Sequence, residues 1–118
     1  MKNILIVDDE ENIRTRYESE LSSEGISTHS VASGEEALRY IEENPDTDLV
    51  ILDIKLPKMD GLTVMEEIRS RKMSMPVILN SAYPTYKSNF ISWLADACLV
   101  KSSNLTELKN QVKGLLAF

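Results

Sequence analysis

Leu49-Val50-Ile51-Leu52-Asp53 is a run of four branched apolar residues that ends in a carboxylate. Residues 4–7 (ILIV) and 77–79 (VIL) have the same character, and Asp8 and Asp9 follow the first of them. Short, continuous apolar runs are typical of strands covered on both faces, as in a parallel sheet flanked by helices. The three runs therefore predict three central strands.

Two further strands and several helices are predicted around this set. Residues 27–31 (STHSV) are much more polar, which fits an edge strand, and Cys98-Leu99-Val100 fits a short strand at the other edge. Apolar residues at helical spacing lie between and after the strands, and Ser33 with Glu36 forms a capping box before one group. The apolar groups are Ile13, Tyr17 and Leu21; Ala37, Leu38 and Ile41; Leu62, Met65 and Ile68, after Asp60-Gly61; Phe90, Ile91 and Leu94; and Leu105, Leu108, Val112 and Leu115, after Asn104. Five βα units in succession predict a doubly wound α/β sheet.

Composition limits the class of function. The 118 residues fit one domain, residues 1–118, with 42% hydrophobic and 27% charged residues. A net charge of −6 argues against direct nucleic-acid contact, which needs clustered Lys and Arg. No apolar segment is long enough to cross a membrane, and the single cysteine, Cys98, permits no internal disulfide. We therefore expect a reducing, cytoplasmic setting.

Polar side chains follow four of the predicted strands. Asp8 and Asp9 follow the first, Asp53 the third, Ser81 the fourth and Lys101 the fifth. Sites in such sheets form in the crevice beyond the carboxyl ends of the strands, so these side chains are expected to meet. Three neighbouring carboxylates repel one another, and a hard divalent cation such as Mg²⁺ removes that cost.

This set of residues favours phosphoryl chemistry. Asp53 could attack phosphorus and become an acyl phosphate, while Mg²⁺ and Lys101 stabilise the charge on the equatorial oxygens. Ser81 could then donate a hydrogen bond to a phosphoryl oxygen. Taken singly, Asp8-Asp9 could be a helix cap, Asp53 a turn former, Ser81 a loop hydroxyl and Lys101 a surface charge. Their coincidence at the strand ends favours the phosphoryl or metal site.

The sequence resembles the receiver domain of two-component response regulators over its whole length. The matching residues are 4–10 (ILIVDDE), 53–61 (DIKLPKMDG), Ser81-Ala82 and Lys101. The resemblance implies five parallel strands in the flavodoxin-like order 2-1-3-4-5 with five flanking helices. It also implies a regulatory phosphoacceptor domain rather than an enzyme.

The same resemblance implies roles for individual residues. Asp53 would accept the phosphoryl group from a phosphohistidine on a sensor histidine kinase or phosphotransfer domain, with Ser81 as the switch hydroxyl and Lys101 as the phosphate-pairing lysine. The implied Mg²⁺ ligands are Asp8, largely through water, Asp9, Asp53 and the backbone carbonyl of Lys55.

The departures from the family pattern all follow Ser81. Lys101 is followed by Ser102 where the family usually has proline, and we expect a trans bond because a cis bond there costs about 2.5–4 kcal/mol. Cys98 stands where a switch aromatic is usual, and Leu94-Ala95 replaces Gly-Ala. The stretch between Ser81 and Lys101 is also shorter than usual.

Several functions stay open at this point. A phosphorylation-switched domain could bind an effector or a second copy through the fourth predicted helix, with Tyr86, Phe90 and Trp93, and the fifth strand. The chain could instead be the N-terminal part of a DNA-binding transcriptional regulator. A degenerate receiver acting as an unphosphorylated interaction module is supported by the altered residues 83–102 and opposed by the complete acidic, hydroxyl and lysine set. A nucleotide or flavin site is discarded, because the sequence has no Gly-rich phosphate loop.

Overall fold

The computed structural model of the protein describes residues 2–71, 73–82 and 95–116. Its elements, in chain order, are β1 (Asn3–Val7), α1 (Glu11–Ser22), β2 (Ser27–Val31), α2 (Gly34–Glu43), β3 (Leu49–Leu52), α3 (Gly61–Ser70), β4 (Val77–Ser81), β5 (Ala97–Val100) and α4 (Thr106–Leu116). All strand pairs are parallel, in the order β2-β1-β3-β4-β5, as the family resemblance implied. The described residues contain four helices. The predicted helix with Phe90, Ile91 and Leu94 lies outside them.

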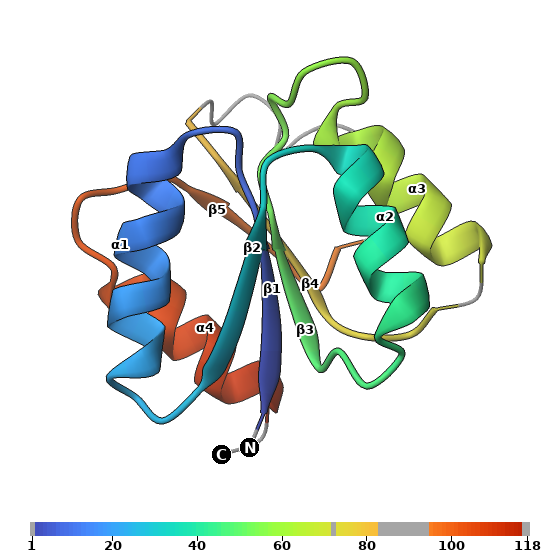
Figure 1. Ribbon diagram of the computed structural model, residues 1–118. Helices are drawn as coiled ribbons and strands as arrows, with labels where there is room; N and C mark the ends of the chain where they lie inside the picture. The colour runs from blue at the N-terminus through green and yellow to red at the C-terminus, as the bar shows by residue number, and fades with distance from the viewer. Residues whose placement is uncertain (1, 72, 83–94, 117–118) are drawn as a thin grey trace.

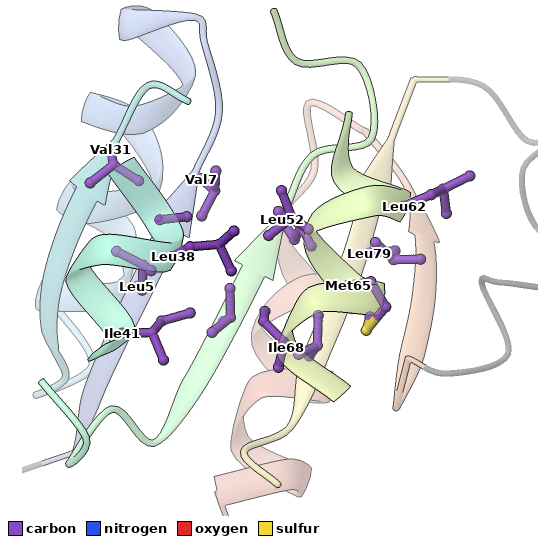
Figure 2. Packing of buried hydrophobic residues seen from close by; sticks show 14 of the residues in the cluster. Leu5, Val7, Val31, Leu38, Ile41, Leu52, Leu62, Met65, Ile68 and Leu79 are labelled. Carbon is purple, nitrogen blue, oxygen red and sulfur yellow. The ribbon is translucent and has the colours of Figure 1, made fainter. Parts of the chain in front are cut away.

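The helices cover both faces of the sheet. Figure 1 shows α1 and α4 on one side and α2 and α3 on the other. Alternate residues of each strand supply the two cores, because successive side chains of a strand point to opposite faces. In β1, Leu5 and Val7 pack toward α2 and α3, whereas Ile4 and Ile6 pack toward α1 and α4. Figure 2 shows the first of these cores, which the side chains of α2 and α3 close over the sheet.

Three helices begin at or directly after polar residues that the sequence placed before their apolar groups. The Ser33 hydroxyl accepts a hydrogen bond from the Glu36 amide (3.2 Å), and the Asp60 carboxylate accepts one from Thr63 (2.9 Å). The Asn104 side chain accepts one from Thr106, the first residue of α4. Each bond satisfies an amide that has no partner inside its own helix. The loops that precede these helices therefore have defined ends.

The two edge strands match the prediction, whereas the last helix buries a residue that the predicted apolar face did not include. β2 and β5 form the two edges as predicted, and Cys98 is partly buried against the core under α2 and α3. On α4 it is Leu116 that is buried, while Leu115 is only partly covered. No peptide bond is cis in the described part of the chain, so the Lys101–Ser102 bond is trans as expected. None of the helices in that part is long and apolar enough to traverse a lipid bilayer.

Strand register brings the predicted polar residues to one edge of the sheet. Val7 is aligned with Leu52 and Leu52 with Leu79, while Ser81 is aligned with Val100. The residues that follow β1, β3 and β5 therefore emerge side by side. Because the strands are parallel, all of them emerge at the carboxyl edge, beyond which ligands bind in this class of sheet.

Candidate functional site

Lys101 joins the two buried carboxylates of the site. Its ammonium nitrogen lies 2.8 Å from Asp8 Oδ2 and 3.1 Å from Asp53 Oδ2. The carboxylate side chains are only 3% and 4% exposed, and that of Lys101 is 14% exposed. Burial alone lowers the pKa of the ammonium, but the hydrogen bond to Asp8 and the charge of Asp53 outweigh it, so the pKa is raised. Lys101 therefore keeps its positive charge at any pH near neutrality at which the carboxylates are ionised.

Asp53 is the most perturbed of these groups. Burial raises its pKa from 3.8 to about 6, the charge of Asp8 adds to the increase, and Lys101 opposes it. Its second oxygen, Oδ1, is buried and accepts no hydrogen bond from the described residues. A buried carboxylate oxygen without a donor is costly, and a coordinated cation removes that cost.

Asp8 is not a helix cap. The residue that precedes α1 is Glu10, whose side chain makes no capping hydrogen bond. Asp8 Oδ1 accepts a hydrogen bond from the Glu10 amide (2.9 Å), while Oδ2 faces Lys101. The backbone carbonyl of Asp8 accepts a further bond from the Arg14 guanidinium (2.8 Å). The capping interpretation of Asp8 is therefore wrong, and both of its oxygens are held in the site.

Asp9 borders the opening of the site. One carboxylate oxygen from each of Asp8, Asp9 and Glu10 can lie within 4.8 Å of the others, and the last two residues are exposed. A cleft of about 170 Å³ is lined by Asp9, Glu10, Asp53, Lys55, Ala82 and Lys101. Oxygen donors of this kind suit Mg²⁺, which binds through one or two carboxylates and keeps several waters. The donors around the cleft thus fit the cation that the sequence implied.

Ser81 ends β4 and is 2% exposed. Its backbone carbonyl accepts a hydrogen bond from the amide of Lys101 at 2.7 Å. This bond links the ends of β4 and β5, so the positions of the hydroxyl residue and the lysine depend on each other.

The turn after Asp53 is shaped by the sequence that follows it. Lys58 has a φ of 65°, a left-handed conformation that few non-glycine residues adopt, and the Gly61 amide donates to the carbonyl of Ile54 (2.7 Å). A Cβ on Gly61 would overlap the backbone carbonyl of Asp53. The glycine therefore lets the start of α3 lie directly against the proposed acceptor.

Sequence reasoning missed a buried polar pair beside the site. Asn80 lies in β4 directly after the apolar run 77–79 and donates a hydrogen bond to the Tyr17 hydroxyl (2.6 Å). Tyr17 had been assigned only to the apolar face of its helix. The one available signal was an amide residue inside a strand predicted to be buried on both faces.

Comparison with known proteins identifies the family. The family model described as "Response regulator receiver domain" matches residues 4–113. The chain belongs to the response-regulator receiver family. This receiver is similar to the response regulator TrrA of Thermotoga maritima, solved with Mg²⁺-BeF, at 48% identity and a TM-score of 0.92. The match covers 98% of this chain and 99% of that one.

Two other solved or curated proteins bear on the receiver's context. A structure of TrrA in complex with the histidine kinase ThkA also matches, with a TM-score of 0.92. The match again covers 98% of this chain and 99% of the matched chain in that complex. The alkaline phosphatase synthesis transcriptional regulatory protein PhoP of Bacillus subtilis is 35% identical over 98% of this chain. This chain spans 48% of the length of PhoP.

Proposed function

We propose that this receiver accepts a phosphoryl group on Asp53 in a Mg²⁺-dependent reaction and thereby switches the binding of a partner or relays the group. The observation that carries the proposal is the asymmetry of the Asp53 carboxylate. One oxygen is paired with Lys101, while the other is buried without a donor among the described residues. Asp53 also lines a cleft whose other walls include Asp9 and Lys101. A carboxylate held in this way can bind a cation through its unpaired oxygen, while its orientation stays fixed for attack on phosphorus.

The group transfer requires little covalent chemistry from the protein. A carboxylate oxygen of Asp53 forms the new O–P bond as the P–N bond to the donor histidine breaks, and the imidazole takes up a proton as it leaves. Lys101 lies close enough to pair with an oxygen of the transferred group, and the Ser81 hydroxyl would donate a hydrogen bond to another. Positioning and charge stabilisation dominate catalysis of phosphoryl transfer. The buried carboxylates and the lysine supply both.

Asp8, Asp9, Asp53 and the backbone carbonyl of Lys55 are proposed to hold the metal. Bound there, Mg²⁺ would neutralise the clustered carboxylates and the charge that develops on the phosphoryl oxygens. Support comes from the carboxylates around the cleft, from the unpaired oxygen of Asp53 and from the Mg²⁺-BeF complex of the similar protein TrrA.

The proposed phosphodonor is a phosphohistidine on a sensor histidine kinase or phosphotransfer domain, in the cytoplasm. The complex of TrrA with ThkA supports the kinase. In this proposal residues 1–118 act as one regulatory phosphoacceptor domain rather than an enzyme. An effector or a second copy would dock through β5, where Val100 is 39% exposed, and the segment with Tyr86, Phe90 and Trp93, which lies outside the described residues.

A second candidate follows from the length of the curated relatives. Because the chain spans about half of PhoP, it could serve as the receiver part of a transcriptional regulator. The chemistry at Asp53 would be the same, and the output would be transcription. The reading frame around the coding sequence distinguishes the two candidates.

Intact mass after incubation with Mg²⁺ and a small-molecule phosphodonor tests the proposal. One phosphoryl group should be added to the wild type, none to Asp53→Ala, and none after the metal is chelated. Circular dichroism of the variant controls for folding. A folded wild-type protein that binds Mg²⁺ and gains no mass would refute phosphoryl acceptance and favour the unphosphorylated interaction module.

A further inference from the structure

Asn80 and Tyr17 form a buried polar pair on the face of the sheet under α1 and α4. The Asn80 amide nitrogen lies 2.6 Å from the Tyr17 hydroxyl oxygen, and each residue is 4% exposed. Apolar residues of the same core, among them Ile78 and Leu99, lie on this face of the sheet. Burial of a polar group is unfavourable unless a partner compensates it, so each residue depends on the other.

The pair is connected to the proposed reacting groups by a short path. Asn80 directly precedes Ser81, whose carbonyl accepts the hydrogen bond from the Lys101 amide at 2.7 Å. The Lys101 ammonium in turn contacts Asp8 and Asp53. Tyr17 belongs to α1, so the hydrogen bond to Asn80 fastens the carboxyl end of β4 to a helix that covers this face of the sheet.

Packing alone does not hold this corner of the molecule. A cleft of about 350 Å³ separates parts of β5, the 102–105 loop and α4, and both Tyr17 and Asn80 line it. A second cleft is lined by Tyr17 together with Lys101 and Ser102. Where close packing is missing, a directed hydrogen bond has more influence on the position of the strand end.

We propose that Tyr17 and Asn80 together are positioning residues, which hold Ser81 and Lys101 in register with Asp53 for phosphoryl transfer. The inference rests on the proposed function of Asp53. It assigns to the pair a role in rate rather than in metal binding, because neither residue contributes an oxygen to the acidic cluster. A small displacement of a positioned group is enough to slow a reaction strongly.

A double-mutant cycle separates positioning from stability. The variants are Tyr17→Phe, Asn80→Leu and their combination. Each single change leaves one buried polar group without its partner, whereas the combination removes both, so stability should fall in the singles and recover in the double variant. Phosphorylation is followed by intact mass at saturating Mg²⁺ and phosphodonor, with urea unfolding and Mg²⁺ titration in parallel. Tyr40→Phe, which makes the same change on α2, is the matched control.

The expected result is that all three variants lose roughly tenfold in the maximal phosphorylation rate. The double variant should lose no more than either single one, and Mg²⁺ affinity should stay within about twofold of wild type in each. A rate that recovers in the double variant together with stability would overturn the inference, because the pair would then be purely structural. Unchanged rates in the single variants would overturn it as well.

A readout that does not need phosphorylation keeps the two proposals distinguishable. The pair should protect the Lys101 amide, which donates to Ser81, so its hydrogen exchange should accelerate in all three variants. In the double variant, where stability recovers, the amides of β1 should exchange as in the wild type. If the wild type takes up no phosphoryl group, the function of Asp53 fails, and this exchange still tests the tether. Unchanged exchange at Lys101 in the stability-matched double variant would refute the positioning role.

Discussion

Gly61 lies against the backbone carbonyl of Asp53 so closely that a Cβ on the glycine would overlap the carbonyl oxygen and carbon. The contact is between backbone atoms, which cannot turn away as the end of a flexible side chain can. Gly61 also begins α3, directly after its cap Asp60. The DG dipeptide of the sequence therefore sets the distance between α3 and the proposed acceptor.

Replacement of this glycine is predicted to damage both stability and the site. Gly61→Ala should lower the free energy of unfolding by about 3 kcal/mol or more, because the backbone of residues 53–54 has to move. Phosphorylation should slow with it. Gly114→Ala is the control: among the described residues no atom outside the backbone of its own helix lies within 4 Å of its added Cβ, and alanine in a helix interior should stabilise by about 0.5–1 kcal/mol. Equal effects at the two positions in urea unfolding would refute the close-contact explanation.

Removal of the Lys101 ammonium is predicted to leave the buried carboxylates of Asp8 and Asp53 without a compensating charge. Lys101→Met without Mg²⁺ should lower the free energy of unfolding by about 3–5 kcal/mol at neutral pH. The loss should shrink on acidification, because Asp53 then binds a proton in the folded state that the unfolded chain binds only at lower pH. Urea unfolding across pH measures this. Lys113→Met removes the partner of the more exposed Glu24, and its effect should not change around pH 6, because Lys113 lowers the pKa of Glu24 below the ordinary value.

The raised pKa of Asp53 predicts that its ionised form opposes folding. Its pKa is about 6 in the folded protein against an ordinary value of 3.8. Above pH 6 the buried charge therefore costs about 3 kcal/mol, and the cost disappears as the pH falls through 6 toward 4. Without Mg²⁺, Asp53→Asn should be more stable than wild type at neutral pH, and the difference should vanish near pH 4. A variant that is less stable than wild type at neutral pH would contradict the assignment.

Magnesium is predicted to stabilise the folded protein. A ligand of the folded state alone adds about 2.7 kcal/mol at 100 times its dissociation constant. Thermal unfolding with increasing Mg²⁺ should therefore show a rising midpoint. Asp9→Asn should weaken the response roughly tenfold in Mg²⁺ concentration because a charged oxygen donor is lost. Asp46→Asn, on an exposed carboxylate in the α2–β3 loop, serves as the control and should leave the response intact. A midpoint indifferent to Mg²⁺ in the wild type would count against a metal site.

Local sequence was sufficient for the elements that the structure describes and for the ends of the strands. Four branched apolar residues before Asp53 indicate a strand that is buried on both faces, and this signal depends only on neighbouring residues. The cap Ser33 was predicted in the same way, because a cap and the amide it accepts from are three residues apart. The strand order was implied only by the likeness to a family and does not follow from these patterns.

The exact pairing between distant segments was beyond the sequence pattern. The sequence predicted that Lys101 would meet the carboxylates, but not that its ammonium would contact both Asp8 and Asp53. The hydrogen bond of Asn80 to Tyr17, between a strand and a helix, was not predicted at all. Neither residue of the second pair carries a local signal of its partner. Leu115, predicted to lie on the apolar face of the last helix, is only partly covered, and Leu116 is the buried residue at the end of α4.

The sequence by itself determined the alternation of strands and helices and the placement of Asp8, Asp9, Asp53, Ser81 and Lys101 at strand ends, since both are properties of neighbouring residues. Only the tertiary structure decided that Lys101 bridges two carboxylates, that one oxygen of Asp53 has no donor among the described residues, and that the pKa of Asp53 is raised. Burial and charge pairing depend on distances between residues far apart in the chain, and those distances exist only when the sheet has formed.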